Sequence, residues 1–474
     1  MKIKLPLSVQ ISFTFLNCCF GSGLLAIPQI AIKIGIVYFI LFNIIAALFS
    51  GFCFVFIIKQ QEVNKCRYKT LTNMISAHYG KYWIFMLDLS IIFCLLPVSY
   101  IAVSADSIAD AFSTLFGLTM LKEKGWKIGL KFICTLCIMY PLTLLKTIKL
   151  LNFISSFCII FVFFTVFYVL IQFIIWQSTG NILGQPHSQP RLQVMPLNND
   201  YFTVFSFICM FMSLYSMSAT IPCIMREYVH DFGLTVEQTV KEIKRAVFYI
   251  TIPIAFTVYT GFGLVGVLLF NSHCEMDQSN NQIDYGCFSI QSNVLLAFTG
   301  DISATVIELL FSLVVFVSFP CMLYPIRKSI ADFFKIDANV NTKKGYLKFN
   351  LIGFIVTIIC LIICSFLNGI DEIQSFTANL LGIVLYGLSG VMLWYKIGRT
   401  PIHQINVIDD AEQVLLDEGQ GEYSQNQEQP LIEEQIVIQP QIKKTRTVIF
   451  WIAVVILISL NCLALGSQVY GWVR

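Results

Sequence analysis

The chain has 474 residues, of which 57% are apolar and 12% charged, and its mean hydropathy is +0.75. A soluble protein carries about twice this share of charged residues, so the composition excludes a soluble domain and indicates a membrane protein with several spans. The net charge of +3 is small and the basic residues are scattered, which argues against a nucleic-acid-binding protein.

Eleven apolar segments are long enough to cross a bilayer, which takes about 20 helical residues. The sequence therefore predicts an all-α polytopic membrane protein. The predicted spans are residues 8–32, 36–58, 83–117, 128–146, 151–176, 201–226, 247–270, 302–326, 347–367, 373–397 and 447–472. The predicted parts are a first set of five helices (1–176), an outer loop (177–200), a second set of five helices (201–397), an inner loop (398–446) and an eleventh helix (447–474).

The orientation follows from the basic residues, which favour the cytoplasmic side. With the N-terminus in the cytoplasm, 24 of the 31 Lys and Arg residues lie in segments expected on that side. The inner loop from 401 to 442 has nine acidic residues, nine Gln and no Lys or Arg. Such a composition cannot bury a core, so we expect this loop to be disordered.

The loop between residues 270 and 302 contains Cys274 and Cys287 and lies on the predicted outer side. An exterior or luminal loop meets an oxidising environment, so we expect a disulfide between them, with two free thiols as the alternative. The remaining cysteines lie mostly in apolar spans, where they are typical small buried side chains.

An amphipathic segment, residues 231–246, precedes the seventh span on the inner side. Val240 and Ile243 belong to one face of a helix, and Lys241 and Lys244 belong to the other. We expect this helix to lie along the membrane surface.

The first span contains a stretch, residues 17–28, that is a poor helix at mid-membrane depth. Gly21 and Gly23 each cost about 1 kcal/mol relative to Ala, and Pro28 removes a backbone donor. A broken helix at that depth must face protein, water or a ligand, because unsatisfied backbone groups are costly in lipid. We expect the amides at Gly21, Ser22 and Gly23 to bind a carboxylate, with close helix packing through small residues as the alternative.

The sixth span carries a second interruption, with four Ser and Thr hydroxyls between residues 213 and 220, followed by Pro222. Interrupted spans at corresponding positions of two halves indicate a transporter site built on an inverted repeat. Carbonyl and hydroxyl groups in this second break would bind an ammonium group. The residues predicted to do so are Tyr215, Ser216, Met217, Ser218 and Ala219.

The eighth span offers two further polar groups. Ser318 stands beside Pro320, so a hydroxyl and a freed carbonyl could bind a monovalent cation, with a serine bonded to its own helix as the alternative. Glu308 lies toward the outer third of the span, where an acid is costly; it is a candidate proton relay or a vestibule acid. The five His residues all lie outside the predicted spans, so no catalytic set is evident and we expect no enzyme.

Four stretches resemble the amino acid/auxin permease family, most closely its sodium-coupled neutral amino-acid transporters. Asn17-Cys-Cys-Phe-Gly-Ser-Gly-Leu-Leu-Ala is similar to the family's Asn-x-x-x-Gly-Ser-Gly-Ile-Leu in helix 1. Pro141-Leu-Thr-Leu-Leu-Lys and Pro320-Cys-Met-Leu-Tyr-Pro-Ile-Arg are similar to the junction of helices 4 and 5 and to the end of helix 8. In helix 6, Pro222 is in register, but Met217 and Ser218 stand where the family has His and Pro.

The resemblance implies a LeuT-like fold, which is a 5+5 inverted repeat, here with an eleventh helix. It also implies a monomer in the lipid bilayer of the plasma, vacuolar or lysosomal membrane that transports amino acids, mainly neutral ones. The coupling ion would be Na⁺ or H⁺, without another cofactor. Asn17 and Ser318 stand where sodium ligands of that family are expected.

Three alternatives remain open at this point. Proton coupling, with Glu308 as its site, would make Asn17 and Ser318 dispensable as ion ligands. An amino-acid sensor would signal through the Gln-rich inner loop, and deletion of residues 404–440 would then matter, whereas a transporter would keep its flux. A channel is the weakest alternative, because no ring of acids or carbonyl filter is visible.

Overall fold

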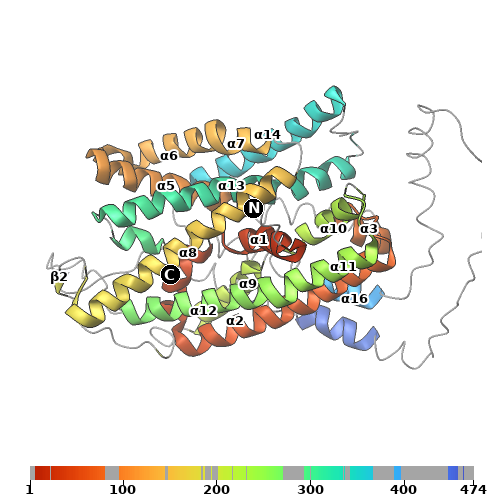
Figure 1. Ribbon diagram of the computed structural model, residues 1–474, viewed down its shortest axis with the longest axis horizontal. Helices are drawn as coiled ribbons and strands as arrows, with labels where there is room; N and C mark the ends of the chain where they lie inside the picture. Colours follow the sequence, from red (N-terminus) through yellow and green to blue (C-terminus); the bar gives the residue numbers. More distant parts are fainter. Residues whose placement is uncertain are drawn as a thin grey trace, which may run out of the picture.

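The computed structural model in Figure 1 describes most of the chain. The described residues are 6–21, 23–80, 96–144, 148–182, 185–186, 194, 201–215, 217–230, 232–270, 293–298, 300–334, 336, 342–366, 389–396, 447–456, 459 and 463. Their regular structure is helical apart from β1 (Asn181–Ile182), which pairs with β2 (Gln185–Pro186) in antiparallel register. Five of their helices are long and apolar enough to cross a membrane. The prediction of an all-α polytopic membrane protein is confirmed.

The first predicted span is broken in two. Helix α1 (Leu7–Cys19) ends in the glycine-rich stretch, and α2 (Gly23–Val63) begins beyond it. Within α2, Gly35 has φ 79° and ψ 156°, which is not helical. An L side chain rarely adopts that conformation, so glycine allows the chain to pass from the first span to the second here, inside the predicted gap.

The remaining elements are assigned by residue number to the two predicted sets of five helices. The first set continues with α3 (Leu71–Tyr79), α5 (Leu96–Phe116), η1 (Thr119–Lys122), α6 (Lys124–Ile133), the π-helix η2 (Cys134–Met139), α7 (Tyr140–Thr143) and α8 (Ile148–Thr179). The second set contains α9 (Tyr201–Leu214), α10 (Thr220–His230), α11 (Val236–Lys244), the π-helix η4 (Arg245–Thr251), α12 (Ile252–Leu269), η5 (Val294–Phe298), α13 (Ile302–Phe333), α14 (Lys343–Phe366) and α16 (Ser389–Lys396). Residues 447–456 are helical as well. The first part of the tenth predicted span, the loop 398–446 and the pair Cys274 and Cys287 lie outside the described residues.

The predicted surface helix at 231–246 is wrong in its placement. Helix α11 continues through η4 into α12 without a break, so residues 236–269 form one rod (Figure 1). The expected apolar face is present, because Val240 and Ile243 are buried. That face packs against α1, α2 and α10 rather than against lipid, so the amphipathic pattern reports a helix–helix contact.

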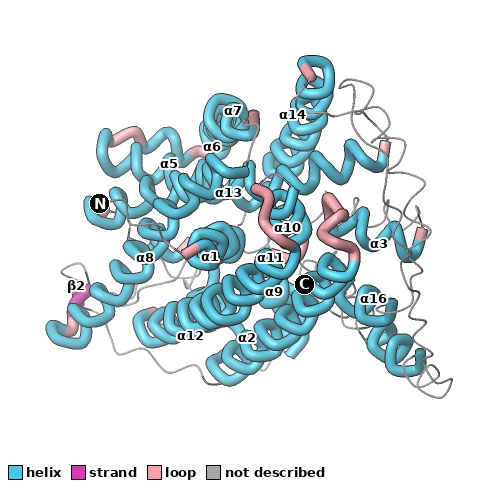
Figure 2. The backbone as a smooth tube through the Cα atoms, turned by 45° about the vertical axis from the view of Figure 1, so that its right-hand side comes forward, coloured by secondary structure: helices cyan, strands magenta, loops and turns pink. Residues whose placement is uncertain are grey.

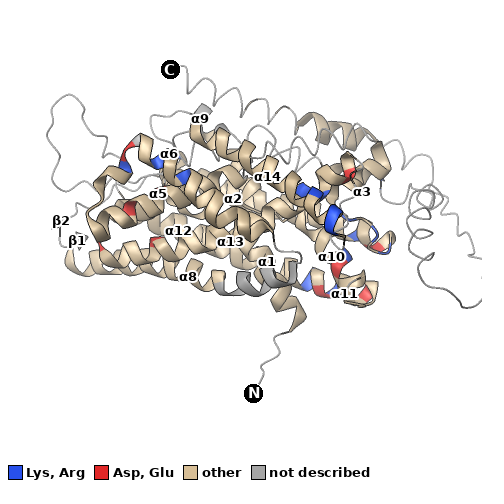
Figure 3. Cartoon of the chain, turned by 90° about the horizontal axis from the view of Figure 1, so that it is seen from above, with Lys and Arg blue, Asp and Glu red and all other residues tan. Residues whose placement is uncertain are grey.

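The helices pack in two groups with α1 between them. Helices α2 and α12 run side by side and α9 lies against α2 (Figure 2). Helix α13 packs against α5, α8 and α14, while α1 contacts both α8 and η4. Charged residues gather at the two ends of the bundle (Figure 3). We call the end with α3 and the start of α1 the inner end, and the end with η1 and the start of α13 the outer end, after the predicted orientation.

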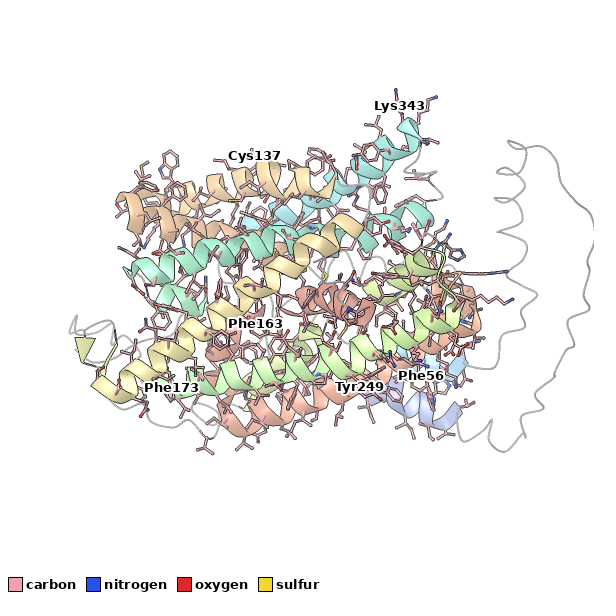
Figure 4. The ribbon with its side chains drawn as sticks, viewed as in Figure 1. Phe56, Cys137, Phe163, Phe173, Tyr249 and Lys343 are labelled. Carbon is pink, nitrogen blue, oxygen red and sulfur yellow. The ribbon has the colours of Figure 1, made fainter. Side chains whose placement is uncertain are left out.

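The sides of the bundle are apolar where they are exposed. Along α8, exposed Phe164, Phe167, Ile171 and Ile174 recur at helical spacing and form a stripe suited to lipid. The sticks in Figure 4 show side chains along the whole length of the helices, with the exposed Tyr249 at the margin of the bundle.

The inner end is held by contacts between helices and connecting segments. The Tyr79 hydroxyl donates to the Met392 carbonyl at 2.9 Å, which ties α3 to α16. Burial, together with the nearby charge of Lys396, lowers the pKa of His78 to about 4, so its imidazole is neutral at physiological pH. The N-terminus of α1 is fixed by Glu242, whose carboxylate accepts from the Ser8 amide at 3.1 Å.

Arg327 belongs to the motif at the end of the eighth predicted span, on α13. It is buried and joins three helices. Its Nη1 donates to the Thr143 carbonyl at 2.5 Å and its Nη2 to Asn350 Oδ1 at 2.7 Å. Its guanidinium also lies 3.9 Å from the centre of the Phe349 ring. These contacts give the motif a structural role, because the arginine connects α13 to α7 and α14.

A glycine lets α2 and α12, which run side by side, approach closely. A Cβ atom on Gly266 would lie 2.3 Å from the Cβ of Pro28 and 2.8 Å from its Cα. The proline in the second half of the broken helix therefore packs directly on the backbone of α12.

Gly266→Ala is expected to lower the melting temperature of the detergent-solubilised protein, because overpacking costs about 1–3 kcal/mol. The control is Gly261→Ala on the same helix, where a Cβ meets nothing within 4 Å. Equal melting temperatures for the two variants would contradict this packing.

Candidate binding site at two broken helices

The two breaks meet at one side chain of α12. Tyr259 is buried, and its hydroxyl oxygen lies 2.6 Å from the carbonyl oxygen of Cys19 and 3.0 Å from that of Leu214. These are the last residues of α1 and α9, so the single proton of one hydroxyl group lies between the terminal carbonyls of both helices. The breaks also approach through Cys18 Sγ, which lies 3.9 Å from Thr220 Oγ1 at the start of α10.

Aromatic rings hold Tyr259 in place. The Phe20 ring, in the first break, meets the Tyr259 ring edge-on with centroids 5.6 Å apart. The Tyr215 ring, in the second break, meets it in the same way at 5.7 Å. Edge-to-face pairs stabilise a fixed arrangement, so the three rings bring the two breaks together at one level of the bundle.

Tyr215, a predicted binding residue, has a side chain that is used within the protein. Its hydroxyl donates to Asn43 Oδ1 at 2.8 Å, and Asn43 Nδ2 donates to Thr260 Oγ1 at 2.9 Å. Asn43 is 0% exposed, so this chain of bonds lies in the interior between α2 and α12. The Tyr215 hydroxyl thus anchors the second break to both long helices, and only its backbone remains a candidate ligand.

Ser218 is a predicted binding residue with a buried hydroxyl that no described group bonds. It is 0% exposed, and its hydroxyl has no hydrogen-bond partner among the described residues. The Met217 carbonyl accepts from the Thr220 and Ile221 amides at 3.0 and 3.1 Å, which starts α10. Ala219 is half-buried, and Ser216 lies outside the described residues. A buried hydroxyl without a partner is costly unless a ligand satisfies it.

The first break contains the predicted carboxylate site. Gly21 is buried and Gly23 half-buried, whereas Ser22 lies outside the described residues. A Cβ on Gly21 would lie 2.3 Å from the hydroxyl oxygen of Tyr100 on α5. Only glycine therefore fits here, and the Tyr100 hydroxyl lies directly at the break.

The structure brings the two predicted cation ligands together. The Ser318 hydroxyl lies 3.1 Å from Asn17 Oδ1, and both residues are at most 1% exposed. The same hydroxyl lies 2.8 Å from the Val314 carbonyl, so the bond to its own helix is also present. These oxygens have the chemistry that Na⁺ accepts, and a cation at this pair stays a prediction. Within the described residues, no group of three or more His, Cys, Asp and Glu side chains is placed to hold a metal ion.

Glu308 lies away from the breaks. It precedes Ser318 by ten residues on α13, which is about 15 Å along a helix toward the outer end. The residue is 1% exposed, and neither carboxyl oxygen has a hydrogen-bond partner among the described residues. It is therefore a buried acid rather than a vestibule acid.

Sequence reasoning missed three residues of the site: Asn43, Tyr100 and Tyr259. An asparagine in the middle of an apolar span was a usable signal, because a polar group at that depth requires a partner. The two tyrosines carried no such signal, since tyrosine is common in apolar spans and only the folded backbone shows what its hydroxyl meets.

Tyr259→Phe is expected to destabilise the protein, because it removes the one donor that two buried carbonyls share, at a cost of about 1–3 kcal/mol. The measurement is the melting temperature in detergent. Tyr249→Phe, on a side chain that is 79% exposed, is the matched control and should leave the melting temperature unchanged. A Tyr259→Phe protein as stable as the control would show that this hydroxyl is not needed at the breaks.

Comparison with known proteins identifies the family. Crystal structures of the manganese transporter of Eremococcus coleocola are similar over 99% of this chain and 90% of that chain at 17% identity. The TM-score is 0.47 for its complex with an aromatic bis-isothiourea substituted compound and 0.49 for a mutant. Because these TM-scores are below 0.5, nothing about this chain is inferred from that likeness. No curated protein matches the chain. The sequence model of the family described as transmembrane amino acid transporter protein matches residues 8–281, which is more than half of the chain. The chain therefore belongs to this family, that of the amino acid/auxin permeases which its motifs resemble.

Proposed function

We propose that the protein is a secondary active transporter of amino acids, mainly neutral ones, with Na⁺ or H⁺ as the coupling ion. The observation that carries this proposal is the meeting of two broken helices around Tyr259, beside the unpartnered hydroxyl of Ser218. Family membership supports membrane transport of an amino acid. Helices that stop inside a membrane supply polar backbone groups where a small polar substrate can bind.

The substrate would lie between the two breaks. Its carboxylate would accept from the amides of Gly21, Ser22 and Gly23, because the start of α2 presents the positive end of a helix dipole. Its ammonium group would donate to carbonyls between residues 215 and 219 and to the Ser218 hydroxyl. The described polar side chains here are neutral, and a neutral site fits a zwitterion that contributes equal positive and negative charge.

A monovalent cation would bind at Asn17 and Ser318. Its charge next to the substrate carboxylate would stabilise both ligands together, so that each favours the state that holds the other. The hydroxyl of Ser318 would then turn from the Val314 carbonyl toward the ion.

Alternating access would move the two packed groups of helices against each other. The contacts of α2 with α9 and α12, and of α13 with α5 and α14, support two such bodies. The bond from the Ser8 amide to Glu242 would close the inner end. We place the N-terminus in the cytoplasm and the protein in the plasma, vacuolar or lysosomal membrane.

Ser318→Ala is expected to raise the Na⁺ concentration that half-saturates uptake of radiolabelled amino acid by proteoliposomes, because one oxygen ligand is lost. Ser365→Ala removes a hydroxyl that bonds to its own helix at 2.8 Å and should not change that concentration. Full uptake by the unmodified protein with choline in place of Na⁺ would exclude sodium at this site.

Ser218→Ala is expected to raise the KM for the amino acid about tenfold or more, since a hydrogen bond to a charged group contributes about 1.5–3 kcal/mol. The melting temperature should not fall, because the hydroxyl has no partner among the described residues. Ser213→Ala, whose hydroxyl already donates to the Met210 carbonyl at 2.7 Å, is the control from the same broken span. An unchanged KM for Ser218→Ala would remove this hydroxyl from the site.

A further inference from the structure

The outer end contains a buried carboxyl group that the substrate site does not use. Glu308 on α13 is 1% exposed, and neither of its oxygens has a hydrogen-bond partner among the described residues. The Ser312 hydroxyl, one turn away, bonds to the backbone carbonyl of Glu308 and not to its carboxyl group. An ionised carboxylate in this position would be desolvated without compensation, which favours the neutral acid.

The helix packed most closely against α13 brings a second acid to the outer end. Asp110 lies on this helix, α5, and is 5% exposed. Lys122 of η1 lies with its Nζ 2.6 Å from Asp110 Oδ1, and its side chain is 39% exposed. From α8, Tyr168 donates its hydroxyl to Asp301 at 2.6 Å, so that pair satisfies itself. The local set is thus two carboxyl groups with one lysine that reaches solvent.

The charges of this set balance when one proton is present. Two carboxylates and one lysine carry a net negative charge, whereas one protonated acid leaves the Asp110–Lys122 pair neutral. Two carboxyl groups can hydrogen-bond to each other only when one of them holds a proton, and such pairs titrate as a unit. A proton on Glu308 therefore removes the buried negative charge. It also supplies the donor for a hydrogen bond between the two carboxyl groups.

We propose that Glu308 and Asp110 form a proton-binding site of the transport cycle, which loads from the outer solution past Lys122. This site is separate from the Asn17–Ser318 pair, and its role in transport rests on the proposed function. One proton moves from water to the Glu308 carboxylate and is released again in the course of the cycle, with no other bond made or broken.

The site is connected to the breaks by two continuous helices. Glu308 lies ten residues from Ser318 on α13, and Asp110 lies ten residues from Tyr100 on α5. Ser318 contacts Asn17, and Tyr100 contacts Gly21. Both helices therefore connect the carboxyl pair at the outer end to the first break. Loss of the proton favours an arrangement in which water reaches Glu308, and its return favours the arrangement in Figure 1, in which Glu308 is buried.

The test uses purified full-length protein in liposomes without Na⁺. Glu308→Gln keeps the shape of the side chain and removes its titration. Amino-acid counterflow without a pH gradient should be retained in this variant, whereas the stimulation of uptake by an imposed pH gradient should be lost. Asp106→Asn is the matched control, because Asp106 lies on the same helix as Asp110 and also pairs with a lysine, Lys127, at 3.1 Å; it should keep both activities.

Infrared titration reports on the site independently of transport. The unmodified protein should show a C=O stretching band of a protonated carboxyl that Glu308→Gln lacks and Asp106→Asn retains. The same band in Glu308→Gln, or unchanged stimulation by the pH gradient in that variant, would overturn the proposal. Absence of counterflow in the unmodified protein would instead count against the proposed function, and the infrared band would still decide whether the proton site exists.

Discussion

The structure depends on how backbone polar groups are satisfied where two helices stop inside an apolar bundle. Each broken helix leaves carbonyl and amide groups that neither lipid nor aliphatic side chains can bond. The Tyr259 hydroxyl is a donor shared by the terminal carbonyls of α1 and α9, and the Asn43–Tyr215 bond fixes the second break to α2. These bonds account for the closeness of α2, α9 and α12, because each of these helices supplies one of the partners.

The same constraint separates structural polar groups from those free to act on a ligand. Tyr215 looked like a ligand from its position, yet its hydroxyl is bonded inside the protein. Ser218 lies three residues further along, equally buried, and its hydroxyl has no partner among the described residues. Among the described side chains of this break, Ser218 is therefore the position where a substrate adds a bond.

The sequence predicts the breaks well because they follow from local chemistry. Gly21, Gly23 and the polar run ending at Pro222 weaken a helix wherever they stand, and α1 and α9 end next to them. The pairing of Asn17 with Ser318 was predicted through the family resemblance, since 301 residues separate them and no local pattern connects them. The role of α11 was misjudged, because an apolar face on a helix indicates burial but does not say whether lipid or protein covers it.

Neutral and ionisable groups are divided along α5 and α13. Near the breaks these helices contribute Tyr100 and Ser318, which are dipoles, while their outer ends contribute Asp110 and Glu308. A fixed charge beside the breaks would bind one end of a zwitterion too well and repel the other, so dipoles suit a substrate that must also be released. An ion that drives transport then binds either to neutral dipoles, as proposed for Asn17 and Ser318, or to a ligand that can lose its charge. A carboxyl group is such a ligand. Its protonated form is stable when buried, whereas its ionised form favours an arrangement in which water reaches it.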